Sequence, residues 1–396
     1  MKTQNYLSNF KSVMIFVVIT MLIMTACAPK SEGEKITEAS EVTESPDKEP
    51  YRIGVILALS GSVAANGVPA SEGIKVAQEE LNGNGGINGH PVEFIIRDDA
   101  SSPDQAATVA TELINSGVIG IFGGSFGSDA NSIGGFLEST DCALLTPTGL
   151  STVEQKEYKN SFFMMPSTYY MGVGIGYFLD EHTDVEKVGI LRLSRDFGQQ
   201  AAAGLAAAAE ERGLEIVAEE QGTDEDLDFT IQLTKLREAN PDAIAVFFAN
   251  PAGATILRQA KELGIEVPLL SAVAMANQPT IDLAGEAAEG LIAEGYLVST
   301  DPLPRQKSFI EVFTEKTGAL PATGFQAMGY DAAMVFVKAI ESINGTVDCL
   351  LVRNAIENMS YEGASGLFNY SPEYHEPDLA GLIYMKVENG KWVMYK

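Results

Sequence analysis

The sequence VIGIFGGSFGS, residues 118–128, decides the fold class of this chain. Residues 118–122 are apolar around one glycine, which is typical of a buried strand, and a glycine-rich turn follows them. Ser128 and Asp129 then predict the N-cap of a helix with apolar residues farther along. A strand, a turn and a helix start in succession indicate a parallel sheet that is covered by helices.

The glycine-rich turn supports two chemical interpretations. Its backbone N–H groups and the hydroxyls of Ser125 and Ser128 lie at the positive end of a helix dipole, which favours anion binding. Residues 123–127, GGSFG, also match the G-x-S-x-G pattern of a nucleophilic serine. A hydrolase needs a histidine after that serine, and only His182 and His375 follow, both in polar loops expected at the surface. Anion binding is therefore the favoured interpretation, and we expect no enzymatic activity.

Composition and charge limit the classes of partner. A length of 396 residues exceeds one ordinary core and predicts two domains, and the 45% share of hydrophobic residues is typical of a globular protein. The 26 basic and 54 acidic residues give a net charge of −28. A surface this negative repels nucleic acid and anionic lipid headgroups, so we expect neither as a partner.

Residues 1–27 resemble a bacterial lipoprotein signal peptide. Lys2 and Lys11 precede an apolar run over 13–24, and Cys27 follows small residues where that run ends. The resemblance implies that Cys27 is lipidated and becomes the new N-terminus, which anchors the protein to a membrane. The alternative is an uncleaved membrane anchor, but a span needs about 20 apolar residues, more than this run supplies.

Residues 28–50 are rich in acidic residues, serine, threonine and proline, and contain no aromatic residue. Such a segment buries too little apolar surface to offset the entropy lost on ordering, so we predict a disordered tether. A lipid and a tether together place the folded body outside the cytoplasm, at the outer face of the cell membrane or in the periplasm.

Two cysteines remain in the folded body, Cys142 and Cys349, and both have apolar neighbours. In an exported protein they could form a disulfide, and two buried free thiols are an equal alternative. The sequence contains no CxxC motif and no cluster of cysteine and histidine, so we expect no structural metal and no cofactor.

The alternation of strand and helix runs through the chain twice. The first half predicts strands over 51–59, 92–97, 118–122 and 143–146, with helices over 70–81 and 105–116. The second half predicts strands over 187–193, 214–219, 243–249 and 268–271, with helices over 199–212, 229–238 and 255–263. The predicted fold is α/β, with two Rossmann-like lobes that each contain a parallel sheet.

The order and wording of several motifs resemble the branched-chain amino-acid family of periplasmic binding proteins. These motifs are IGVILALSG, NGNGGINGHPVEFIIRDDASSPDQA, LLTPTG, DFGQQ, LRQAKELGI, AGEAAEG and GYDAAMVFVKAI. The resemblance covers residue 51 to the C-terminus. It implies two lobes that close on a small ligand and deliver it to an ABC permease. A ligand-sensing subunit of a membrane receptor would share this fold and is the alternative.

The resemblance also implies three crossovers between the lobes, near Ser167, near Ser299 and within 366–372. The extended residues before the first two positions are compatible with this. The implied domains are residues 51–167 plus 299–367 for lobe 1, and residues 168–298 plus 368–396 for lobe 2.

Ligands of open parallel sheets bind beyond the carboxyl ends of the strands. By the resemblance, residues 125–128 with Thr148 and Gly149 hold a carboxylate through hydroxyls and backbone N–H groups. The full set of candidate ligand-binding residues is Ser60, Ser125, Phe126, Gly127, Ser128, Thr148, Gly149, Tyr169, Phe197, Asn250 and Val273.

Departures from the family pattern bear on the ligand. Family members that bind α-amino acids often have an acidic residue where this chain has Val273 or Thr168. Phe197 stands where tyrosine is common, and Asn250 where another aromatic residue is frequent. An ammonium group without a carboxylate partner is poorly compensated. The hypothesis is therefore a carboxylate ligand that lacks a free α-ammonium group.

Overall fold

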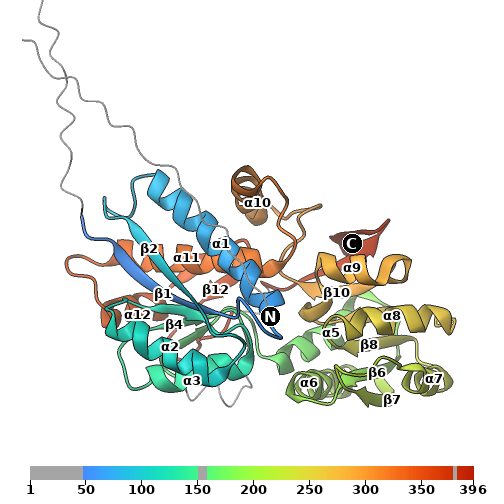
Figure 1. Cartoon of the computed structure of the whole chain (residues 1–396). Helices are drawn as coiled ribbons and strands as arrows, with labels where there is room; N and C mark the ends of the chain where they lie inside the picture. Colours follow the sequence, from blue (N-terminus) through green and yellow to red (C-terminus); the bar gives the residue numbers. More distant parts are fainter. Residues whose placement is uncertain (1–47, 150–157, 378–380) are drawn as a thin grey trace, which may run out of the picture. The chain divides into compact units, whose positions relative to one another are not determined.

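The computed structural model describes residues 48–149, 158–377 and 381–396 (Figure 1). The predicted signal peptide and residues 28–47 of the predicted tether lie outside these ranges. Lys48 Nζ donates a hydrogen bond to the Asn88 carbonyl at 2.7 Å, and the Glu49 carbonyl bonds to His90 at 2.8 Å. The last residues of the predicted tether are therefore fixed against a turn, which corrects its predicted end. No helix in the described part of the chain is long and apolar enough to cross a membrane.

The first sheet has five parallel strands in the order β2-β1-β3-β4-β5. Its strands are β1 (Tyr51–Leu57), β2 (Val92–Asp98), β3 (Ile121–Gly123), β4 (Leu144–Thr146) and β5 (Ser161–Phe163). The helices between them are α1 (Ala64–Gly83), α2 (Pro103–Asn115) and α3 (Gly127–Leu137). The continuous apolar runs are buried because helices cover the sheet, as a parallel arrangement requires.

The second sheet has seven strands in the order β14-β13-β10-β9-β8-β6-β7. The parallel strands are β6 (Lys187–Leu193), β7 (Glu215–Gly222), β8 (Ala243–Phe247), β9 (Leu269–Ser271) and β10 (Ile292–Gly295). Two antiparallel strands, β13 (Ile383–Glu388) and β14 (Lys391–Met394), extend the sheet beyond β10. The accompanying helices are α5 (Thr168–His182), α6 (Asp196–Arg212), α7 (Thr230–Glu238), α8 (Ala252–Glu262) and α9 (Gln278–Ala284). The predicted α/β fold with two parallel sheets is confirmed, and the antiparallel extension was not predicted.

After the second sheet the chain returns to the first domain. The returning elements are α10 (Pro304–Thr317), α11 (Gly324–Ser342), α12 (Cys349–Glu357) and the hairpin of β11 (Ser360–Glu362) and β12 (Leu367–Asn369). Helix α11 packs closely on α1: a Cβ at Gly73 would lie 1.9 Å from the Gln326 carbonyl oxygen, and one at Gly329 would lie 2.0 Å from that of Ala70. Both helices therefore need glycine at their crossing.

The third passage between the domains occurs later than the predicted residues 366–372. Tyr370 Oη donates to the Phe163 carbonyl at 2.9 Å, and the Phe163 N–H donates to the His375 carbonyl at 2.8 Å. Both residues thus still contact β5 of the first sheet, and the chain reaches the second sheet only at β13. The hairpin of β11 and β12 keeps this segment in the first domain, which sequence periodicity did not reveal.

Two predicted helix starts are corrected. Helix α1 begins at Ala64 instead of residue 70, although Gly67 and Pro69 weaken its sequence pattern. Gly67 is needed for packing, because a Cβ there would lie 2.3 Å from the Ala58 carbonyl oxygen. Helix α3 begins at Gly127, and its N-cap is Phe126 instead of Ser128.

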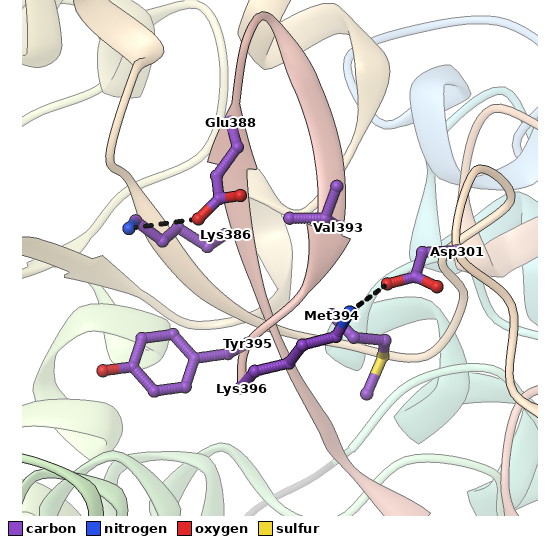
Figure 2. Close-up of a pocket in the computed structure, with 7 residues that line it drawn as sticks. All are labelled: Asp301, Lys386, Glu388, Val393, Met394, Tyr395 and Lys396. Carbon is purple, nitrogen blue, oxygen red and sulfur yellow. Dashed lines mark hydrogen bonds and ion pairs between the residues drawn. The ribbon is translucent and has the colours of Figure 1, made fainter.

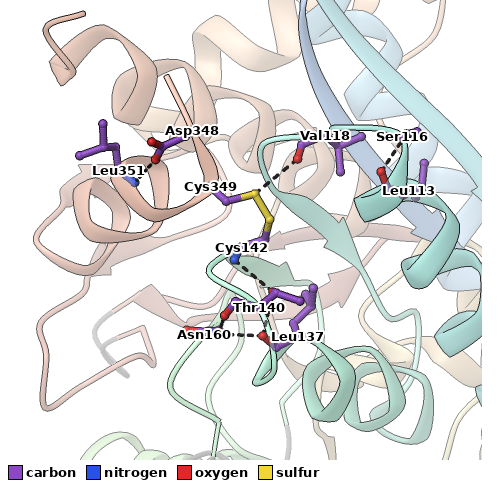
Figure 3. The surroundings of a disulfide bond; sticks show 10 residues. All are labelled: Leu113, Ser116, Val118, Leu137, Thr140, Cys142, Asn160, Asp348, Cys349 and Leu351. Atoms are coloured by element: carbon purple, nitrogen blue, oxygen red, sulfur yellow. Dashed lines mark hydrogen bonds between the residues drawn. A yellow bond between two sulfur atoms is a disulfide. The ribbon is translucent and has the colours of Figure 1, made fainter. Parts of the chain in front are cut away.

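The structure resolves the alternative left open for the two cysteines. Cys142 and Cys349 form a disulfide, with their Cα atoms 4.4 Å apart (Figure 3). The Cys142 N–H donates to Thr140 Oγ1 at 3.1 Å, and the Asp348 side chain caps α12 directly before Cys349 by accepting from the Leu351 N–H at 2.9 Å. The bond joins the segment before β4 to the start of α12, which lies 207 residues farther along the chain.

Candidate ligand-binding site

The N-terminus of α3 presents the clearest anion-binding geometry at the carboxyl edge of the first sheet. Phe126 has an extended backbone at the N-cap and leaves 44% of its surface exposed. Gly127 and Ser128 follow in the first turn, where helix N–H groups have no carbonyl partner within the helix. Ser128 is exposed, and its Oγ lies 3.4 Å from Asp129 Oδ1. An anion at this point would meet free N–H groups, a hydroxyl and an aromatic face.

Ser125 has a different position from its neighbours. Its side chain is 2% exposed, and its Oγ accepts a hydrogen bond from the Ala58 N–H at 2.8 Å. The Ser125 carbonyl accepts from Asn66 Nδ2 at 3.1 Å. Ser125 thus joins the loop after β3 to the loop after β1, and this geometry disfavours the predicted role of its side chain in ligand binding.

The positions of the two histidines decide whether Ser125 could act as a nucleophile. His375 was expected at the surface, but it is half-buried: its ring stacks on Phe162 at 4.3 Å and its Nδ1 lies 3.1 Å from the Ser161 carbonyl oxygen. His182 is exposed and contacts Phe178 at the end of α5, in the second domain. Each histidine thus has its partners away from Ser125, whose hydroxyl faces the interior.

Ser60 follows β1 and is exposed, but its hydroxyl proton is engaged. Ser60 Oγ donates to Asp98 Oδ2 at 2.7 Å. Asp98 Oδ1 also accepts from the N–H groups of Leu59 at 2.9 Å, Ser60 at 3.3 Å and Ala100 at 2.8 Å. Partial burial acts to raise the pKa of Asp98, but these hydrogen bonds together lower it. Ser60 can therefore accept a hydrogen bond from a ligand, and could donate one only by releasing Asp98.

Two buried carboxyl groups lie beneath the α3 turn. Asp99 is 0% exposed and Asp129 is 1% exposed, and the Oδ2 atom of each has no hydrogen-bond partner among the described residues. Burial and, to a smaller extent, the charge of Asp99 raise the pKa of Asp129 to about 6, against the hydrogen bonds from Ser128 and Phe126 that lower it. Burial also raises the pKa of Asp99. The carboxylate site thus has an ionisable neighbour whose charge changes near neutral pH.

The sequence did not predict this pair. Asp98 and Asp99 are visible as a doublet at the end of β2, and Asp129 as an acid in the first turn of α3. Only the strand order β2-β1-β3 brings the ends of β2 and β3 to either side of β1.

Thr148 and Gly149 follow β4 and are both half-buried. A Cβ at Gly149 would lie 2.2 Å from the Pro166 carbonyl oxygen, so this loop packs tightly against the first passage between the domains. Ser167 caps α5 by accepting from the Tyr170 N–H at 3.4 Å. Tyr169, half-buried in the first turn of α5, contacts Tyr170 edge-on at 5.6 Å. The predicted residues Thr148, Gly149 and Tyr169 are thus all next to this passage.

The second sheet carries the remaining predicted residues at the carboxyl ends of β6, β8 and β9. Phe197 is half-buried in the first turn of α6, and Val273 is half-buried in the 3-10 turn after β9. Asn250 Nδ2 donates to Thr280 Oγ1 at 2.7 Å and to Asn277 Oδ1 at 3.2 Å. Asn250 Nδ2 is therefore held by the start of α9, whereas its Oδ1 is buried without a hydrogen-bond partner among the described residues. Phe197 and Val273 form the apolar surface of this edge.

A pocket lies on the hairpin of β13 and β14 (Figure 2). Its charged groups pair with one another: Lys386 with Glu388 at 3.3 Å, and Lys396 with Asp301 at 3.7 Å. None of the predicted site residues lines it. In the described ranges, no group of three or more His, Cys, Asp or Glu is placed to hold a metal ion.

The two sheets, the second extended by an antiparallel hairpin, carry polar turns at the carboxyl ends of their parallel strands, where ligands of such sheets bind. The family model for periplasmic binding proteins matches residues 50–391, and the chain belongs to that family. Within it, the comparisons support the branched-chain amino-acid group with the type I fold.

The relatives come from several bacteria. The leucine-, isoleucine-, valine-, threonine- and alanine-binding protein of Pseudomonas aeruginosa is 26% identical over 309 residues, which cover 78% of this chain and 82% of that protein. The solved leucine-binding protein of Thermotoga maritima is 26% identical with a TM-score of 0.75, covering 87% of this chain and 97% of that one. The isoleucine complex of a branched-chain amino-acid substrate-binding protein of Streptococcus pneumoniae has a TM-score of 0.76 at 24% identity, covering 87% and 98%.

Proposed function

We propose that this chain is an extracytoplasmic solute-binding lipoprotein of an ABC importer. Its two domains close around a small carboxylate ligand and deliver it to the permease. The observation that carries the proposal is the start of α3, where Gly127, Ser128 and the exposed Phe126 offer N–H groups, a hydroxyl and an apolar face. The relatives described as binding branched-chain amino acids support a ligand of this size.

The size of each contribution to the binding free energy explains why both domains are needed. Hydrogen bonds to a charged group contribute about 1.5–3 kcal/mol each, so two from the α3 turn give roughly 5 kcal/mol before association costs. Burial of about 120 Å² of ligand hydrocarbon adds about 3 kcal/mol. Phe197 and Val273 on the second sheet are the apolar surfaces that we propose supply this burial.

We further propose that the ligand lacks a free α-ammonium group. Val273 is apolar, and Asn250, whose Nδ2 donates to α9, offers an uncharged amide oxygen instead of a carboxylate. In the first domain the Asp98 carboxylate already accepts from Ser60, Leu59 and Ala100. Asp99 and Asp129 each keep an Oδ2 without a partner, but both residues are buried beneath the α3 turn. An ammonium group would therefore lack an exposed carboxylate among these residues, which is unfavourable in a closed site.

Calorimetric titration tests both parts of the proposal. The matched probes are leucine and 4-methylpentanoate, which is leucine without its ammonium group. We expect 4-methylpentanoate to bind and leucine to bind at least tenfold more weakly. Micromolar binding of leucine would refute the ammonium-free ligand, while leaving the carboxylate site in place. If neither these probes nor other branched-chain amino acids and simple carboxylates bind, the carboxylate site itself is wrong.

The Ser128→Ala variant gives the matching residue-level prediction. The Ser128 hydroxyl donates to Asp129 Oδ1 over a long 3.4 Å, so it can turn to a ligand carboxylate at small cost. Loss of this donor is expected to weaken binding of 4-methylpentanoate about tenfold. Ser308, an exposed serine on α10, is the control, and Ser308→Ala should leave the affinity unchanged. Equal affinities of the two variants would remove Ser128 from the site.

Localisation is tested at Cys27. If Cys27 is the lipidated residue, cells grown with radiolabelled palmitate will label the wild-type protein, and the Cys27→Ala variant will carry no label. A labelled Cys27→Ala protein, or an unlabelled wild-type protein, would contradict lipidation at this residue.

A further inference from the structure

Leu227 and Ile231 are the most exposed large apolar side chains among the residues that the structure describes, at 83% and 72% of their surfaces. Leu227 lies in the loop of residues 223–229 between β7 and α7, and Ile231 lies in the first turn of α7. Scattered apolar residues on a surface are ordinary. Two apolar side chains this exposed, four residues apart on one short segment, indicate an interaction site.

The loop is held rigidly in this exposed conformation. The Thr223 N–H donates to Asp226 Oδ2 at 2.7 Å, and Gln259 Nε2 donates to the Leu227 carbonyl at 3.1 Å. Gln259 Oε1 also accepts from the N–H of Phe229, which is fully buried. The backbone on either side of Leu227 is thus fixed, and its side chain is directed away from the core. A preordered apolar residue of this kind loses little entropy on binding a partner.

Acidic side chains surround the two apolar residues. The segment TDEDLDF, residues 223–229, contains four acidic residues and no basic one. Asp224 forms an ion pair with Arg195, and hydrogen bonds from Thr230 lower the pKa of Asp228. Glu225 is exposed. The loop therefore keeps a negative potential around its apolar tip, which complements a basic surface.

The charge also argues against two other occupants. A second copy of this chain carries the same net charge of −28, so self-association through an acidic loop is disfavoured. An anionic membrane surface is repelled for the same reason. A protein surface with an apolar pocket and a rim of lysine or arginine fits both features of the loop.

The loop also lies at the ligand edge of the second sheet. It follows the carboxyl end of β7, where the Gly222 carbonyl accepts from the Ser194 N–H at 2.8 Å. The ion pair of Asp224 with Arg195 joins it to the segment that continues into Phe197. A partner on this loop would therefore contact the edge that carries candidate ligand-binding residues.

We propose that residues 223–231 form the docking surface for a basic-rimmed protein partner, with Leu227 and Ile231 inserted into its apolar pocket. The inference rests on the proposed function, under which this partner is the ABC permease. Beyond the proposed function, we assign residues 223–231 as the contact segment, Leu227 and Ile231 as its anchors, and an apolar pocket with a basic rim as the partner surface.

The experiment uses the mature wild-type chain and its cognate permease–ATPase complex in nanodiscs, with ATP hydrolysis as the readout. The Leu227→Ser/Ile231→Ser double variant should need at least a tenfold higher concentration for half-maximal stimulation, since both anchors are lost. Leu283→Ser, at an exposed leucine of α9, should behave like wild type. All variants should keep the wild-type affinity for 4-methylpentanoate.

The contribution of the loop's negative charge to docking is tested with Glu225→Gln. The control is Glu266→Gln, which alters an exposed acid before the amino end of β9. Raising salt from 50 to 300 mM should weaken wild-type stimulation, and Glu225→Gln alone should reduce that dependence. If wild type does not stimulate the ATPase, the proposed function fails and the docking partner with it. If wild type stimulates and the double variant does so equally, only the docking surface is wrong. Two results would assign the loop to another occupant and overturn the inference. The first is a wild-type dimer in light scattering that the double variant no longer forms. The second is wild-type binding to phosphatidylcholine vesicles that the double variant loses.

Discussion

Removal of the disulfide is expected to lower the midpoint of thermal unfolding of the protein by about 7 °C. The bond between Cys142 and Cys349 closes a loop of 207 residues. Cross-linking such a loop reduces the entropy of the unfolded chain and contributes about 5 kcal/mol. With an unfolding entropy of about 2 cal/mol/K per residue over roughly 350 residues, this free energy corresponds to that shift in the midpoint.

Scanning calorimetry of the oxidised protein, the reduced protein and the Cys142→Ala/Cys349→Ala variant measures the effect. The reduced protein separates the loss of the cross-link from the packing lost in the variant, because Cys142 is buried against apolar neighbours. We expect the reduced protein and the variant to unfold within a few degrees of each other. A midpoint that reductant does not change, with both thiols alkylated in the native protein, would show that the bond is absent in solution.

The sequence predictions were accurate where they depended on interactions between residues close together in the sequence. The strand, turn and helix of residues 118–137 were predicted because apolar runs and glycine-rich turns are local signals. The N-cap of α3 was placed at Ser128 because serine is a frequent cap. In the structure Phe126 takes that position, with φ −147° and ψ 162°, so the turn ends earlier than residue preference indicates.

Features that depend on distant contacts were not predictable. The disulfide joins residues 207 apart, and sequence alone left free thiols as an equal alternative. Ser125 was a candidate for ligand binding, and neither its burial nor the bond that its hydroxyl accepts from Ala58, in the loop after β1, is visible in the sequence. The third passage between the domains falls after His375 because Tyr370 and His375 contact β5. In each case the deciding partner lies on a segment far away in the sequence.

Asp129 is expected to make the affinity for a carboxylate ligand rise as the pH falls from 8.0 to 5.5. Burial raises the pKa of Asp129 to about 6, so the group is ionised at pH 8.0 and largely neutral at pH 5.5. Its charge lies in the first turn of α3, next to Ser128, and repels a bound carboxylate. Two like charges about 6 Å apart at an effective dielectric constant of 20–40 interact by about 1–3 kcal/mol, so we expect an increase of about tenfold.

Calorimetry with 4-methylpentanoate at several pH values measures this dependence, and Asp129→Asn is the matched variant. The variant should bind at pH 8.0 about as tightly as wild type binds at pH 5.5, and its affinity should change little with pH.

The thermal stability of Asp129→Asn gives a second readout. Because the pKa of Asp129 is raised in the folded state, its contribution favours folding below pH 4 and is lost as the pH rises from 4 to 6. Asp129→Asn should therefore unfold at a higher temperature than wild type at pH 8.0. The stability of the variant should still fall with rising pH, because burial raises the pKa of Asp331 to about 6 as well. A variant with the wild-type pH dependence of affinity would separate Asp129 from the carboxylate site.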